Sequence, residues 1–295
     1  MTAGLCDTLT VCDTKPGLAE AFTEELKHVK ASIGREIEIN PCERDDKVSN
    51  ADIILISAGE PRKPGAKMTR RDLAIQNAKI IKEVSEATSH RNPAAKYIVI
   101  SNPVDAMAMI CKKYTKADFV ISTGTNLESL RFRSKIAEML KVPVSLVRGW
   151  VGGEHGEAAL PLWSTTEVDN VPIREYDAFK KLSNQENEVE TYMKQVSKMI
   201  VDSIGGTEFG PAVSFRDITQ AIVKNTNEVL PIAAPMKFRG IPDAVFVGIP
   251  RFVGEKLGKT LYDLLLPCEQ EGLFKAAEVI YQTYSAAVEE LEGSL

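Results

Sequence analysis

Several features that mark particular classes of protein are scarce or missing in this sequence of 295 residues. The five cysteines are odd in number and lack the spacing of metal ligands, which favours reduced thiols and no metal site. No apolar stretch approaches the roughly 18 residues of a membrane span, and the N-terminus does not resemble a signal peptide. A net charge of −5 without a long basic run argues against a nucleic-acid partner. We therefore predict a cytoplasmic protein without a membrane or nucleic-acid partner.

Histidine is also scarce, with only three residues in the chain. A proton carrier that works near neutral pH must come from these three unless another group is strongly perturbed. His28 and His90 lie in polar surroundings and are expected to be structural or solvent-facing. His155 lies among glycines, in the segment 151–157, where the backbone can approach a ligand closely. His155 is therefore the candidate for acid–base chemistry.

The first 123 residues alternate between short apolar runs and helical patterns. The expected strands cover residues 9–12, 51–57, 97–101 and 119–122, and a helix is expected over 71–87. Continuous apolar strands separated by helices are typical of a doubly wound parallel sheet that is covered on both faces. Ligands of such sheets bind beyond the carboxyl ends of the strands, where Asp13, Ser57 and Asn102 follow their strands directly.

From Gly124 onward the pattern changes to longer helices with a few β-rich pieces. Helices are expected over 127–140, 184–203, 214–225 and 269–291, and β-rich segments over 244–249 and 261–265; the segment 144–151 leads from the first helix to the His155 loop. No repeat, low-complexity segment or flexible linker is present. We predict two domains, a dinucleotide-binding domain over 1–123 and an α+β substrate domain over 124–295.

Four segments together carry a family resemblance. They are Pro61-Arg-Lys-Pro-Gly65, Asn102-Pro-Val-Asp105, Gly124-Thr-Asn-Leu-Glu-Ser-Leu-Arg131 and Val151-Gly-Gly-Glu-His-Gly-Glu157. Their order and spacing resemble the lactate/malate dehydrogenase family, from near residue 4 almost to the C-terminus. The resemblance implies a Rossmann-type α/β domain followed by an α+β substrate domain, NAD as cofactor, and a homo-oligomer (dimer or tetramer).

One element of the family pattern is missing. Members open with a buried strand and a Gly-x-Gly-x-x-Gly loop, which receives the dinucleotide pyrophosphate on a helix N-terminus. None of the nineteen glycines here are spaced two apart. Asp13 matches the acid that binds ribose, which normally follows that loop by about 20 residues, yet only twelve residues precede it. We expect that the first strand, the loop and most of the first helix are missing. An upstream extension of about 30 residues is expected to improve NAD binding and stability.

By resemblance, His155 is the proton donor beside the substrate carbonyl, where charge develops as hydride arrives. The matching partner that orients its imidazole is Glu128, where the family ordinarily carries aspartate. The extra methylene lengthens this arm by about 1.5 Å. We expect that Glu128 can still reach His155 with a modest rotamer or backbone change.

Binding of the substrate carboxylates is expected to depend on arginines, because guanidinium groups bind carboxylates in a planar, bidentate way. By resemblance, Arg131 clamps the carboxylate next to the reacting carbon, and Arg70 polarises the carbonyl. Arg71 competes for the role of Arg70, since Ala66-Lys67 looks like an insertion. Arg62 occupies the position that favours a second carboxylate, and therefore malate over lactate. From the residues alone, this stretch is also compatible with a solvated basic loop.

The resemblance also implies a set of cofactor-binding residues. Asp13 favours NAD over NADP, because a carboxylate hydrogen-bonds ribose hydroxyls and repels a 2′-phosphate. Asn102 is expected to contact both the substrate and the nicotinamide ribose, although asparagine before proline is also common turn chemistry. The expected set is Asp13, Ser57, Gly59, Asn77, Asn102 and Thr207.

The activity that these residues imply is reversible, NAD-dependent hydride transfer between malate and oxaloacetate, a tricarboxylic acid cycle reaction on a small dicarboxylate. Within the enzyme class, lactate or another 2-hydroxy acid is the alternative substrate. A non-catalytic homologue that does not bind the cofactor is a second alternative, suggested by the missing glycine loop and by Glu128. A related glycosidase activity receives no support, since no Cys/His cluster is present.

Overall fold

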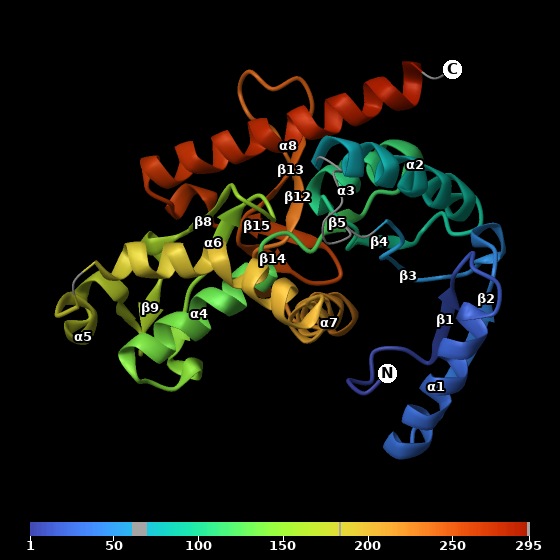
Figure 1. Cartoon of the computed structure of the whole chain (residues 1–295), viewed down its shortest axis with the longest axis horizontal. Coiled ribbons are helices and arrows are strands. Elements are labelled where there is room, and N and C mark those ends of the chain that lie inside the picture. The colour runs from blue at the N-terminus through green and yellow to red at the C-terminus, as the bar shows by residue number, and fades with distance from the viewer. Residues whose placement is uncertain (61–69, 183, 294–295) are drawn as a thin grey trace. The chain divides into compact units, whose positions relative to one another are not determined.

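The computed structural model describes residues 1–60, 70–182 and 184–293, with the element order shown in Figure 1. The chain forms two compact units. The first unit comprises Met1–Val120 and Thr283–Leu295, and the second comprises Ile121–Gln282. The division falls within strand β5 (Val120–Ser122) and within the last helix, α8 (Pro267–Gly293). The predicted boundary at residue 123 lies close to the first of these points, but the last residues group with the first unit.

The first unit alternates strands and helices as expected. Its elements are β1 Thr8–Cys12, α1 Leu18–Ile33, β2 Glu38–Cys42, β3 Ile53–Ile56, α2 Arg70–Ser89, β4 Lys96–Val99 and α3 Val104–Thr115. Helix α2 buries Ala74, Ala78 and Ile81, a spacing of four and three residues that forms one apolar stripe. This stripe allows α2 to pack closely against α3, whose residues Val104 to Cys111 are all buried (Figure 1).

The strands of the first unit form two parallel pairs. Strand β1 pairs with β2, and β3 pairs with β4. Within β4, the Tyr97 N–H donates to the carbonyl of Phe119, the residue before β5, at 2.9 Å. Within the described residues, the other edges of β1 and β3 have no strand partner. Leu55 of β3 is 44% exposed. The prediction that this strand is covered on both faces was therefore wrong in the described part of the chain.

The second unit is built mainly from antiparallel strands and longer helices. Its helices are α4 Asn126–Leu140, α5 Asp177–Lys180, α6 Gln185–Ile204 and α7 Phe209–Lys224, together with the first part of α8. Its strands are β6 Val147–Arg148, β7 Val151–Gly153, β8 Ala159–Pro161, β9 Glu167–Val168, β10 Val171–Pro172, β11 Glu228–Leu230, β12 Ala233–Met236, β13 Val245–Gly248, β14 Arg251–Val253 and β15 Leu257–Thr260. Strands β12, β13, β7 and β8 run antiparallel, and Ala233 of β12 pairs with Ser122 of β5.

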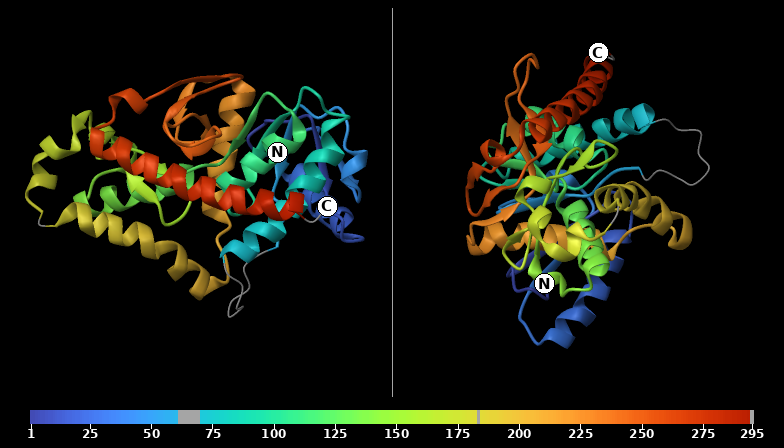
Figure 2. Two further views of the ribbon diagram at one scale, coloured as in Figure 1. Left: turned by 90° about the horizontal axis from the view of Figure 1, so that it is seen from above. Right: turned by 90° about the vertical axis from the view of Figure 1, so that its left-hand side faces the viewer.

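An aromatic core lies under helix α4. Phe132 contacts Trp163 edge-on with ring centroids 5.1 Å apart, and Trp163 contacts Phe179 at 5.9 Å. Val151 and Val168 belong to the same buried cluster. Helix α6 packs along α4, as the views in Figure 2 also show. This packing fixes the helix that carries Glu128 and Arg131.

Two predicted segments of the second unit were wrong in position. The predicted β-rich segment 261–265 contains a 3₁₀ turn at Tyr262–Leu264, and the strand β15 precedes it. Helix α7 begins at Phe209 instead of Ser214. Pro211 does not prevent this earlier start, because it lies in the first turn, where a helix tolerates proline.

Candidate active site

The central feature of the second unit is a contact between helix α4 and the loop that follows β7. Nδ1 of His155 lies 3.1 Å from Oε2 of Glu128, and 3.1 Å also separates it from Oε1. Nη1 of Arg131 lies 3.6 Å from the same carboxylate. Glu128 and Arg131 are three residues apart, which places them on one face of α4. The side chain of Glu128 therefore reaches the His155 ring, as expected for this longer residue.

The three side chains of this group differ in exposure. The Glu128 side chain is 9% exposed, that of Arg131 12% and that of His155 24%. The carboxylate therefore lies deepest, and the imidazole is the most accessible to a ligand. Nδ1 faces the carboxylate, which accepts a hydrogen bond in the tautomer that carries its proton on this nitrogen.

Electrostatics keep the Glu128 carboxylate ionised in spite of its burial. Burial by itself raises the pKa of a carboxyl group, but the charge of His155, its hydrogen bond and the charge of Arg131 together hold the pKa of Glu128 below its ordinary value. An ionised glutamate stabilises the protonated imidazole. The pair therefore favours a ring that carries a transferable proton.

Two buried hydroxyls that sequence reasoning missed hold α4 against β7. Thr125 Oγ1 donates to the Val151 carbonyl at 2.6 Å, and the Val151 N–H donates to Ser129 Oγ at 2.9 Å. Ser129 in turn donates to the Thr125 carbonyl at 2.9 Å. The exposed fractions of Thr125 and Ser129 are 0% and 1%. The only sequence signal for this clamp is a pair of hydroxyl residues four apart, at the N-cap and in the first turn of the helix that bears Glu128.

Gly153, two residues before His155, is required by the backbone of this segment. Gly153 has φ of 96°, and a Cβ at this position would come within 2.3 Å of the Ala158 carbonyl oxygen. Glu154 closes the loop, since its Oε2 accepts the Ala158 N–H at 3.3 Å. The hairpin between β7 and β8 therefore explains Gly153 without any ligand.

The expected cofactor residues of the first unit lie at the carboxyl ends of its strands. Asp13 follows β1, and its Oδ1 accepts the Lys15 N–H at 2.8 Å. Ser57 and Gly59 follow β3, and Asn102 follows β4; all three are exposed. A carboxylate and exposed hydroxyl and amide groups at these ends suit the sugars of a dinucleotide.

Asn77 links two of these strand ends. It is 2% exposed. Its Oδ1 accepts the Glu60 N–H at 2.7 Å, and its Nδ2 donates to the Asn102 carbonyl at 2.6 Å. A Cβ atom added to Gly59 would lie 3.1 Å from Oδ1 of Asn77. Asn77 thus holds the loops after β3 and β4 in place from inside the unit.

The other predicted site residues are placed less fully. Arg62 lies outside the described residues, and Arg70 begins helix α2, with its side chain outside the description. Arg71 is the second residue of α2, and its side chain is likewise outside the description. Thr207 lies between α6 and α7 and is half-buried. Of the expected substrate arginines, the structure thus brings Arg131 alone, within the described residues, to the Glu128–His155 pair.

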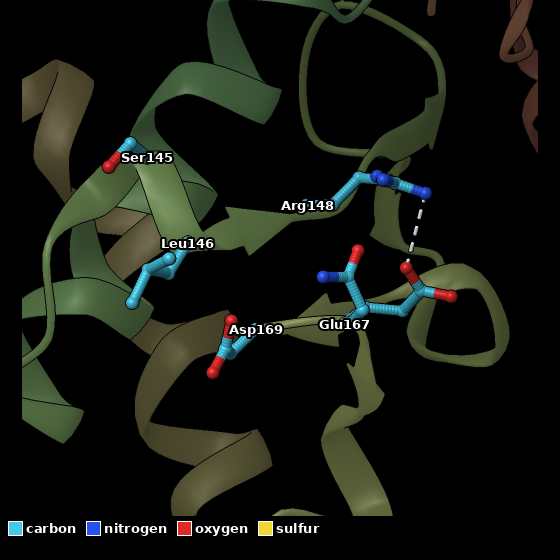
Figure 3. Close-up of a pocket in the computed structure, with 6 residues that line it drawn as sticks. Ser145, Leu146, Arg148, Glu167 and Asp169 are labelled. Atoms are coloured by element: carbon cyan, nitrogen blue, oxygen red, sulfur yellow. Dashed lines mark ion pairs between the residues drawn. The ribbon is translucent and has the colours of Figure 1, made fainter.

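A small cavity of about 80 Å³ lies elsewhere in the second unit (Figure 3). Arg148 and Glu167 in its lining form an ion pair of 3.2 Å. The cavity contains none of the predicted site residues. It is lined by Ser145, Leu146, Arg148, Glu167, Asp169 and Asn170.

No group of three or more histidine, cysteine or acidic side chains in the described part of the chain is arranged to hold a metal ion. None of its helices combines the length and apolarity needed to cross a lipid bilayer.

Models of two protein domains match nearly the whole chain. The NAD-binding domain of lactate/malate dehydrogenases matches residues 1–119, and their alpha/beta C-terminal domain matches residues 125–290. The first unit is thus a Rossmann domain that binds NAD, and the second is the α/β C-terminal domain.

Individual relatives include both malate and lactate dehydrogenases. A malate dehydrogenase of Sulfurisphaera tokodaii is 39% identical over 99% of this chain and 92% of the relative. An L-lactate dehydrogenase of Lactobacillus acidophilus is 30% identical over 95% and 90%. The crystal structure of malate dehydrogenase from Plasmodium falciparum superposes with a TM-score of 0.90 at 26% identity, and covers 98% of this chain and 92% of that chain. The chain therefore belongs to the lactate/malate dehydrogenase family of NAD-dependent oxidoreductases.

Proposed function

We propose that this protein is a malate dehydrogenase that interconverts malate and oxaloacetate. The contact of His155 with the buried Glu128, with Arg131 beside them, is the observation that carries the proposal. It provides a proton donor and a carboxylate-binding group on neighbouring elements. The malate dehydrogenase relative at 39% identity supports the choice of substrate.

His155 acts as the acid in reduction and as the base in oxidation. Glu128 accepts the hydrogen bond of the Nδ1–H group and so sets the tautomer and orientation of the imidazole. When bound, NAD supplies or accepts the hydride. The imidazole delivers its proton to the oxygen as charge develops there, and the ionised Glu128 stabilises the protonated ring before that step.

The arginines provide substrate recognition. Arg131 binds the carboxylate next to the reacting carbon through its planar guanidinium group. Arg70 polarises the carbonyl, and Arg62 pairs with the second carboxylate of a dicarboxylate. A site with an arginine for that carboxylate disfavours pyruvate, because the cation is then left without a partner.

Residues 1–123 form the cofactor domain and residues 124–295 the substrate domain of this proposal. Asp13 binds the adenosine ribose and so favours NAD over NADP. Thr207 lines the nicotinamide side of the pocket, and Asn77 holds the loops that carry Glu60 and Asn102. We place the enzyme in the cytoplasm, in the tricarboxylic acid cycle, as a homo-oligomer.

The test is a comparison of oxaloacetate with pyruvate as substrates of the purified chain, followed by NADH absorbance. We expect kcat/KM to be at least about 100-fold higher for oxaloacetate than for pyruvate. Pyruvate leaves the charge of Arg62 buried without a partner, and an unpaired buried charge costs roughly that factor. Arg62→Gln should narrow or reverse this ratio, and Lys47→Gln, which also removes one positive charge in the same unit, should leave it unchanged. A preference for pyruvate in the unmodified protein contradicts the malate assignment.

Lactate is the second candidate substrate, and the 30% identity to an L-lactate dehydrogenase favours it. The same comparison decides between the two. If neither keto acid is reduced while NADH binds, the chain is a non-catalytic member of the family.

A further inference from the structure

Two thiols face each other at the carboxyl ends of β1 and β2. Cys12 and Cys42 are direct partners in this parallel pair. Neighbouring strands lie about 4.8 Å apart, which is inside the range of about 4.4–6.8 Å between the Cα atoms of a disulfide. Side chains of directly opposed residues point to the same face of a sheet. Both cysteines are free and only half-buried, so a small oxidant can reach them.

The two thiols have different hydrogen-bond partners. Cys12 Sγ donates to Asp45 Oδ1 at 3.3 Å, and Cys42 Sγ donates to the Arg44 carbonyl at 3.1 Å. Burial raises the pKa of Cys12, and hydrogen bonds with Asp45 and with Cys42 raise it further. Cys12 is therefore held as a thiol in contact with Cys42. This arrangement leaves Cys42 to make the first attack on an oxidant.

The end of β2 at Cys42 and Glu43 also supports the loop that presents Asp13. The Asp13 N–H donates to the Cys42 carbonyl at 3.0 Å, and the Gly17 N–H donates to Glu43 Oε1 at 2.9 Å. A bridge between Cys12 and Cys42 removes both thiol hydrogen bonds and joins the residue before Asp13 to the residue whose carbonyl accepts the Asp13 N–H. The carboxylate that we assign to the adenosine ribose is the group most directly affected.

We propose that Cys12 and Cys42 form a redox-active pair, whose closure to a disulfide weakens NAD binding at Asp13. The effect on NAD rests on the proposed role of Asp13, whereas bridge formation does not.

The oxidant is a low-molecular-weight disulfide such as oxidised glutathione. The Cys42 thiolate attacks one of its sulfurs, which forms a mixed disulfide and releases one glutathione thiolate. Cys12 then loses its proton to solvent and attacks the Cys42 sulfur, which releases the second glutathione. Two protein thiols are oxidised, and one glutathione disulfide is reduced to two thiols. Because Cys12 must deprotonate, ring closure is expected to accelerate as the pH rises.

The experiment uses the full chain with Cys6→Ser and Cys268→Ser, which leaves Cys12, Cys42 and the buried Cys111. This protein is incubated with oxidised glutathione and digested with trypsin. Cleavage after Lys27, Lys30 and Arg35 separates the two cysteines, so a bridge appears as two joined peptides. NADH affinity is measured by fluorescence titration before and after oxidation, and again after reduction with dithiothreitol.

We expect joined peptides that contain Cys12 and Cys42, and NADH binding about tenfold weaker, the loss of roughly one hydrogen bond to a charged group. Reduction should restore the affinity. Cys42→Ser and, separately, Cys12→Ser in the same background should make the NADH affinity insensitive to the oxidant.

Three outcomes overturn the proposal or part of it. Absence of joined peptides, with only glutathione adducts, excludes the bridge. A complete bridge without a change in NADH affinity excludes its effect on the cofactor. The role of Asp13 is tested separately in reduced protein by Asp13→Asn, which should weaken NADH binding. If that variant binds normally while oxidation still weakens binding, the assignment of Asp13 fails and the redox pair stands.

Discussion

Replacing Glu128 by glutamine tests the centre of the proposed site. The change keeps the shape of the side chain and removes its charge. Coulomb's law at the 3.1 Å between Glu128 and His155, with an effective dielectric constant of about 20, gives an attraction of about 5 kcal/mol for the protonated ring. Part of this attraction offsets the cost of burying the carboxylate, which the amide does not have. We therefore expect the barrier to keto-acid reduction to rise by about 2–3 kcal/mol, or about 30- to 150-fold in kcat.

The assay is steady-state reduction of oxaloacetate across a pH range, followed by NADH absorbance. Loss of the counter-ion should move the alkaline limb of the kcat profile to lower pH, while NADH binding stays the same. Glu138→Gln is the matched control, because Glu138 is an exposed carboxylate on the same helix. Glu128→Asp retains the charge and should recover most of the rate if the shorter arm still reaches the ring. An unchanged kcat and pH profile for Glu128→Gln would refute the electrostatic reasoning.

The same substitution has a consequence for stability. The pKa of Glu128 is lower in the folded protein than its ordinary value of 4.5. Its ionised form therefore contributes stability that is present above pH 4.5 and is lost as the pH falls through the folded pKa. In urea unfolding, the free energy of the unmodified protein should fall more steeply than that of Glu128→Gln over this acid range. Parallel pH dependences in the two proteins would contradict the low pKa.

Two further predictions concern buried polar groups. Arg251 is 8% exposed, and its Nε has no hydrogen-bond partner among the described residues. Burial also lowers the pKa of its guanidinium group. Replacement of this buried charge in Arg251→Met should therefore raise the free energy of unfolding by about 1 kcal/mol in urea titrations. A loss of stability would instead reveal a partner for the guanidinium. Asn77→Ala leaves the Glu60 N–H and the Asn102 carbonyl unpaired, and should lower the free energy of unfolding by about 2–3 kcal/mol. A loss below about 0.5 kcal/mol would show that water replaces the amide.

Much of the fold could be predicted because periodicity and burial agree in this chain. The helix expected over 127–140 is α4 at Asn126–Leu140, and the strand expected over 97–101 is β4 at Lys96–Val99. The error at 261–265 has a physical cause. That apolar run suits a strand, but hydrogen bonding to β14 selects the preceding segment Leu257–Thr260 in spite of its glycine and lysine. Such a choice depends on partners that are distant in sequence.

The candidate site was predictable to the same degree. The spacing from Glu128 to Arg131 fixes one helical face, and the structure shows both side chains there. The Thr125–Ser129 clamp on Val151 was not predictable, because it joins two elements whose proximity no local pattern encodes. Asn77 was expected to contact the cofactor, and its role as a link between two loops likewise emerges only in three dimensions.

The elements that carry Glu128, Arg131 and His155 all belong to one of the two compact units. On the roles proposed above, proton delivery and binding of the reacting carboxylate can diverge during evolution independently of Asp13, which we assign to the coenzyme. A lineage that changes its nucleotide preference can therefore keep the same proton donor.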